Sequence, residues 1–172
     1  LDPVSETVSP PVLGISANFG KQLVWTNAKL TAEAIGGDNS VVNFYVHDSA
    51  IDSYQFVATA QGEAASPIEN VRVDQSFAGA ASDGSTFFFS IRKSLDSTPV
   101  APGGEVDKLY GFDRVSGQLS YLGILPDGSL DPTGSFGANP ELQVVFDGAA
   151  VAFHAVSDSG TRVYWKDHER ES

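Results

Sequence analysis

The chain of 172 residues contains no cysteine and no methionine, and it has only 10 basic residues against 22 acidic ones. Without cysteine there is no disulfide, no thiolate metal site and no cysteine nucleophile. The formal charge of −12 disfavours binding to nucleic acid or to an anionic lipid surface. Because no run of about 18 apolar residues is present, the sequence also predicts no membrane-spanning helix. We therefore expect neither nucleic acid nor membrane as a partner.

Motifs for catalysis and for cofactor binding are missing as well. The sequence has no His-Glu-x-x-His, no Gly-x-Ser-x-Gly, no phosphate-binding loop and no Gly-x-Gly-x-x-Gly. The acidic segment 127–131 lacks the spacing of a calcium loop. We expect no catalytic residues, no metal and no cofactor, and the sequence favours a protein that is not an enzyme.

Short β-rich runs separated by Gly, Asp, Ser and Pro fill most of the chain. Such runs with turns at regular spacing predict an all-β fold in a single domain, residues 1–172. Only segment 28–35 has helical propensity, for one or two turns at most. The expected strands lie at 21–26, 41–47, 54–59, 71–73, 86–91, 108–112, 118–122, 142–146, 150–156 and 162–165.

A Tyr-x-x-Asp pattern occurs three times, at Tyr45, Tyr110 and Tyr164, with spacings of 65 and then 54 residues. An apolar run precedes each copy. Repetition at such a period predicts stacked or radially arranged units. We expect an extended arm at 1–12 and units at about 13–66, 67–130 and 131–172. This organisation favours β-propeller-like antiparallel repeats, with a β-sandwich as the alternative. The tyrosine would pack between units and the aspartate would accept turn amides.

Two families resemble parts of this pattern. Residues 82–89, with the sequence Ser-Asp-Gly-Ser and an apolar strand, and residues 109–119 resemble a blade of the TolB-type β-propellers. Residues 150–167, which include Arg162-Val163-Tyr164, resemble the fungal fucose-specific lectin propellers. The lectin resemblance implies that a strand arginine donates hydrogen bonds to a sugar beside an aromatic platform. Only Arg162 matches that arginine, and Asn43 and Lys108 stand at the places that we take as equivalent.

These resemblances imply a candidate ligand site. Its residues are Arg162 and an aromatic platform, Trp165 or Trp25, although burial between sheets is the alternative for both tryptophans. The sequence thus favours a non-enzymatic binding or scaffold module with a carbohydrate ligand. The first alternative is a fragment or subunit of a propeller-type glycosidase or lactonase. The second is a structural subunit of a surface assembly or fibre.

The sequence also predicts where the protein is located and how it assembles. Acidity and the lack of cysteine suit a secreted microbial protein, so we expect an extracellular location. Since the chain starts at Leu1 and has no methionine, we expect a processed start. Three units are too few to close a propeller ring of the usual four to eight blades. The edge of the last sheet would be covered by the head, by the rest of a longer chain or by a second copy. We favour another chain.

Overall fold

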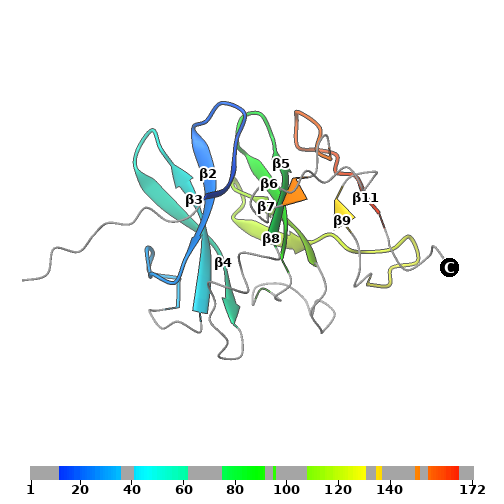
Figure 1. Ribbon diagram of the computed structural model, residues 1–172, viewed down its shortest axis with the longest axis horizontal. Coiled ribbons are helices and arrows are strands. Elements are labelled where there is room, and N and C mark those ends of the chain that lie inside the picture. Colours follow the sequence, from blue (N-terminus) through cyan, green and yellow to red (C-terminus); the bar gives the residue numbers. More distant parts are fainter. Residues whose placement is uncertain are drawn as a thin grey trace, which may run out of the picture.

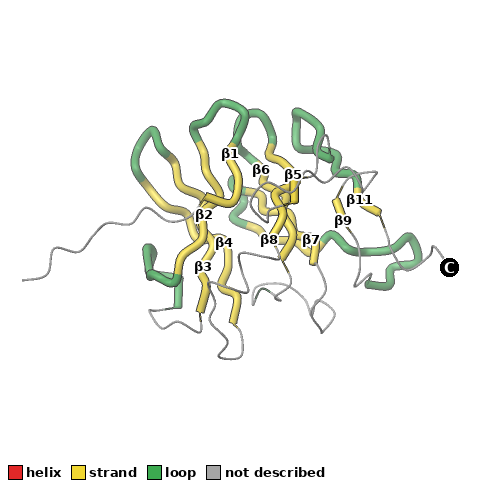
Figure 2. Tube along the Cα trace, in the orientation of Figure 1, coloured by secondary structure: helices red, strands yellow, loops and turns green. Residues whose placement is uncertain are grey.

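The computed structural model describes residues 12–35, 41–61, 75–91, 95, 108–130, 135–136, 150–151 and 155–166. These residues form strands and turns but no helix (Figures 1 and 2), which confirms the predicted all-β class. The expected arm, apart from Val12, and the expected strands at 71–73 and 142–146 lie outside the described residues. The strands are β1 (Val12–Ile15), β2 (Lys21–Thr26), β3 (Val41–Asp48), β4 (Ser53–Gln61), β5 (Gln75–Ala80), β6 (Thr86–Ile91), β7 (Lys108–Asp113), β8 (Gln118–Tyr121), β9 (Ser135–Phe136), β10 (Ala150–Val151) and β11 (Trp165–Lys166).

Eight of these strands form two antiparallel four-stranded meanders, β1-β2-β3-β4 and β5-β6-β7-β8. β10 extends the second sheet by pairing parallel to β5, and β9 pairs with β11. In Figure 1 the three sheets follow one another across the molecule from left to right. The boundaries of β2 and β6 match the prediction, whereas β5 was missed because its sequence, Gln-Ser-Phe-Ala-Gly-Ala, has no β-branched residue.

The two meanders are copies of one unit displaced by 65 residues. Their first strands carry bulges at equivalent glycines, Gly14 and Gly79. A Cβ on Gly14 would collide with the ring of Phe77 in the neighbouring unit, so only glycine fits there. The spacing predicted from the first two tyrosines is therefore confirmed as a structural repeat.

The turn that joins the first and second strands recurs a third time, 76 residues after its second occurrence, and we call the described residues around it the third unit. Tyr164 therefore corresponds to Phe88 in a second strand, and its N–H bonds to the Ala155 carbonyl at 2.8 Å. The prediction that Tyr164 is structurally equivalent to Tyr45 and Tyr110 is wrong. The Tyr164 side chain is 57% exposed, whereas Tyr45 and Tyr110 are fully buried. The bonds closing the three turns run from Ser16 N to Lys21 O, from Ala81 N to Thr86 O and from Ser157 N to Arg162 O.

The main core lies between the two meanders. Alternation in β3 turns Val42, Phe44 and Val46 toward the second sheet, as its sequence predicts. The ring of Phe44 stacks on Phe89 of β6 with centroids 5.9 Å apart. Burying each such side chain contributes about 1.5–3 kcal/mol, so this layer joins the two units firmly.

A second cluster lies on the far face of the β5–β8 sheet. There Phe88 and Leu109 pack against Ala155, with Val163 and Trp165 beside them. The second sheet is thus buried on both faces. Among the described residues, the first sheet is covered by another sheet on one face only.

An ion-pair cluster also crosses from the first unit to the second. Asp48 at the end of β3 lies 2.8 Å from the Lys21 ammonium and 3.1 Å from the Arg114 guanidinium of the second unit. The Gln55 amide donates to the Arg114 carbonyl at 2.9 Å. The hydrogen bond from Lys21, with further help from the Ala50 amide and the two cations, lowers the pKa of Asp48.

Candidate binding surface

The outer face of the first sheet, turned away from the second sheet, carries its side chains in rows across the strands. Strand register places Gln22 of β2, His47 of β3 and Tyr54 of β4 side by side. We call these three residues the outer row. The next row contains Tyr45 and Phe56, which lie opposite each other in β3 and β4.

The second sheet has an apolar row at the equivalent positions, formed by Phe87, Phe112 and Leu119. All three side chains are buried in the core between the sheets. The outer row therefore places an amide, an imidazole and a phenol where the other copy of the unit has three apolar side chains. No described strand covers these polar groups.

The imidazole of His47 is held on both sides. It stacks on the Tyr54 ring with centroids 4.6 Å apart and planes inclined by 20°. Its Nε2 lies 3.0 Å from the Asp52 carboxylate, whose side chain is 90% exposed. Asp52 sits in the β3–β4 turn at φ 46°, a left-handed conformation that aspartate tolerates better than most residues. The row thus ends in an accessible carboxylate beside an aromatic stack.

Tyr45 forms a rigid base beneath this row. Its ring meets Tyr54 and Phe56 edge to face, with centroids 6.1 and 6.0 Å away. The hydroxyl accepts from the Leu30 N–H at 3.1 Å and donates to the Ala28 carbonyl at 2.9 Å. Burial raises the pKa of Tyr45, against a smaller lowering by the Leu30 amide, which keeps the hydroxyl protonated for its donor role.

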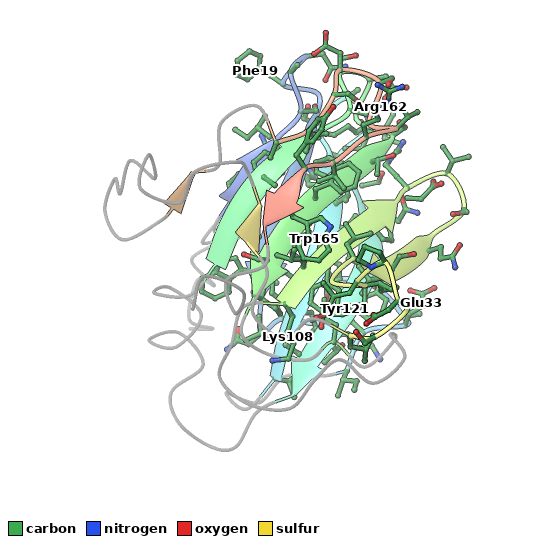
Figure 3. All side chains as sticks on the ribbon, turned by 90° about the vertical axis from the view of Figure 1, so that its right-hand side faces the viewer. Phe19, Glu33, Lys108, Tyr121, Arg162 and Trp165 are labelled. Carbon is green, nitrogen blue, oxygen red and sulfur yellow. The ribbon has the colours of Figure 1, made fainter. Side chains whose placement is uncertain are left out.

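The three site residues expected from the sequence do not come together. Trp25 packs against the core between the first and second sheets, and Trp165 packs on the far face of the second sheet. The β5–β8 sheet therefore lies between them. Arg162 is exposed at the turn end of the molecule, the end where Figure 3 also shows Phe19, while Trp165 lies further along the strands. Both tryptophans are half-buried and pack against apolar clusters.

The repeat also reassigns Arg162. Its equivalents are Lys21 and Thr86, because all three carbonyls close the same turn. The expectation that Asn43 and Lys108 occupy the equivalent places is wrong. Arg162 thus takes the place of a lysine that pairs with a carboxylate in the first unit.

Sequence reasoning missed the outer row, although one sequence feature marks it. Aligning the first two units at the 65-residue spacing sets Gln22 against Phe87 and His47 against Phe112. A polar residue at a position that is apolar in the other copy points to a different environment. The alternation in β3 predicts the face of His47 but not what covers it.

In the described part of the chain, no three His, Asp or Glu side chains gather as metal ligands would. Nor do the described residues form a helix long and apolar enough to cross a bilayer. The outer row can offer an aromatic surface and an amide to a ligand, and the neighbouring Asp52 can offer a carboxylate. No protein-family model, curated protein or solved structure matches this chain.

Proposed function

We propose that this chain is a non-enzymatic binding module built of propeller-like repeats, and that it binds carbohydrate on the outer row. The observation that carries the proposal is the replacement of an apolar row by Gln22, His47 and Tyr54 on a face that no described strand covers. These residues differ from those at the equivalent positions of the second unit, which indicates that this surface has a function of its own.

The chemistry of the row suits a sugar. A pyranose presents an apolar C–H face and a rim of hydroxyls, and an aromatic ring with polar neighbours complements both. Gln22 can donate and accept, and the exposed Asp52 carboxylate accepts from two directions. The ring contacts around Tyr45 fix the platform before a ligand arrives, which limits the entropy lost on binding.

The propeller-like arrangement is supported by repeated contacts between successive units. Gly84 of the second unit lies against Ser16 of the first, and Gly160 of the third lies against Ala81, the equivalent of Ser16. One geometric step therefore relates both pairs of turns, as in radially arranged blades. The proposal includes a secreted, extracellular location, and the charge of −12 suits a protein that stays in solution.

A glycan array followed by calorimetric titration of the strongest saccharide tests the proposal. We expect Tyr54→Ala and Gln22→Ala each to weaken binding about tenfold or more, equivalent to about 1.4 kcal/mol. Tyr54→Phe retains the ring and should retain most of the affinity. Tyr164→Ala removes an exposed tyrosine elsewhere and is the matched control.

The same titration separates the alternatives. An array without a saccharide signal, or affinity lost in Arg162→Ala but unchanged in Tyr54→Ala, would contradict the outer row as a sugar site. Cleavage of the bound saccharide would show that the protein is a glycosidase and not a binding module. Thermal melting of each variant distinguishes lost binding from lost folding.

A further inference from the structure

The turn between β1 and β2 contains an unusual residue for its backbone conformation. Phe19 has φ 58°, and its side chain is 72% exposed. At the equivalent positions of the second and third units stand Gly84 and Gly160, with φ 71° and φ 68°. A bulky residue in this left-handed region is rare, because its Cβ approaches the carbonyl oxygen. The first unit thus departs from its repeat at this turn.

The two glycines show what this position normally contacts. A Cβ on Gly84 would lie 2.7 Å from Lys21 Cγ in the first unit, and a Cβ on Gly160 would lie 2.8 Å from Ala81 Cβ in the second. Each glycine therefore lies directly against the turn of the preceding unit. A phenylalanine in that place would occupy the space that such a preceding turn needs.

The outer face of the first sheet also differs from its counterpart in the second unit, at positions other than Phe19. Besides the outer row, Thr26 stands at the position of Ile91, which is buried between the two sheets. Gln22, Thr26 and His47 are already half-buried. Joining another unit to the first sheet in the same way would remove their remaining contact with water and set them against apolar side chains. Polar groups buried without partners oppose association, and this is how natural interfaces exclude wrong partners.

We propose that Phe19, Gln22, Thr26 and His47 make the outer face of the first sheet a built end of the repeat array, which rejects a further unit of the same kind. The face rejects such a unit whether it belongs to this chain or to a second copy. The face then stays accessible to a polar ligand, and repeat arrays commonly have such polar end units. The inference concerns assembly and holds whether or not the ligand is a sugar.

Hydroxyl-radical footprinting at rising protein concentration tests this surface directly. Phe19 and Tyr54 are both oxidisable, and both lie on the end surface. In the unchanged chain, we expect their labelling to stay constant from low to high micromolar concentration. The graft Phe19→Gly/Gln22→Phe/Thr26→Ile/His47→Phe, which installs the residues of the second unit, should lose Tyr54 labelling as concentration rises and should gain mass in light scattering.

Two results would overturn the inference. One is concentration-dependent protection of Phe19 and Tyr54 in the unchanged chain, which would mean that another unit docks there. The other is a folded graft that remains monomeric and fully labelled. The smaller variant Phe19→Gly/His47→Phe is measured in parallel, so that the test stands if the fourfold graft fails to fold. Saccharide binding plays no part in these readouts, so they do not depend on the proposed function.

Discussion

The hydroxyl of Tyr110 accepts a hydrogen bond of 3.2 Å from the backbone N–H of Leu95, 15 residues earlier in the chain. Tyr45 accepts the same bond from Leu30, also 15 residues earlier. The first residue of Tyr-x-x-Asp thus fastens the connection between the second and third strands of its unit. The aspartates of the pattern accept turn amides, Asp48 from Ala50 and Asp113 from Val115, as predicted.

Removing the Tyr110 hydroxyl should destabilise the fold. In Tyr110→Phe the ring keeps its packing, but the buried Leu95 N–H loses this acceptor. A buried hydrogen bond contributes about 0.5–1.5 kcal/mol, so the free energy of unfolding should fall by about that amount in urea denaturation. Tyr164→Phe removes an exposed hydroxyl and should change it by less than about 0.5 kcal/mol. Equal effects in both variants would show that the Leu95 bond contributes nothing.

Glycine at position 19 should stabilise the protein. Phe19→Gly relieves a left-handed conformation that costs a residue with a Cβ about 1–2 kcal/mol, partly offset by the greater backbone freedom of glycine when unfolded. We expect a net gain of about 0.5–1 kcal/mol. Gly84→Ala, the reverse change at the equivalent turn, should destabilise because its Cβ would also meet Lys21. A melting temperature lowered by Phe19→Gly would show that the phenyl ring makes a stabilising contact.

The ion pairs of Asp48 should make stability depend on acidic pH. Its folded pKa lies below the ordinary 3.8, so the carboxylate contributes stability that is fully present above that value and is lost as pH falls through the lower folded pKa. In Asp48→Asn this contribution is absent at every pH. The urea midpoints of the two proteins should therefore differ most at neutral pH and converge in strong acid. A gap that stays constant down to about pH 2 would contradict this assignment.

Truncating Phe89 should weaken the contact between the units. Phe89→Ala removes the partner of Phe44 and leaves a cavity between the two sheets. Phenylalanine-to-alanine changes in cores cost about 3–5 kcal/mol, enough to unfold a marginal domain. Val115→Ala, at an exposed turn residue, serves as the control and should be nearly neutral. Scanning calorimetry compares the two, and a small loss for Phe89→Ala would mean that the sheets fold independently.

Much of the local structure could be predicted from the sequence. The β-rich runs at 21–26 and 86–91 become strands with the predicted boundaries, because propensity and flanking turn residues agree there. β5 could not be predicted in this way, because its small residues form a strand only through pairing with β6. The candidate site around Arg162 could not be predicted either, because the residues near Trp25 and Trp165 in the sequence do not show how the sheets pack around them.

The sequence by itself determined the all-β class, the turns, the period-two alternation of β3 and the 65-residue repeat. These depend on each residue and its near neighbours, through backbone conformation and strand geometry. Only the tertiary structure decided that Tyr164 stands at the place of Phe88, that both tryptophans pack half-buried against apolar clusters, and that no described strand covers Tyr54 and His47. Burial depends on contacts between residues far apart in the chain. The same alternating strand therefore becomes core or surface according to the sheet that packs against it.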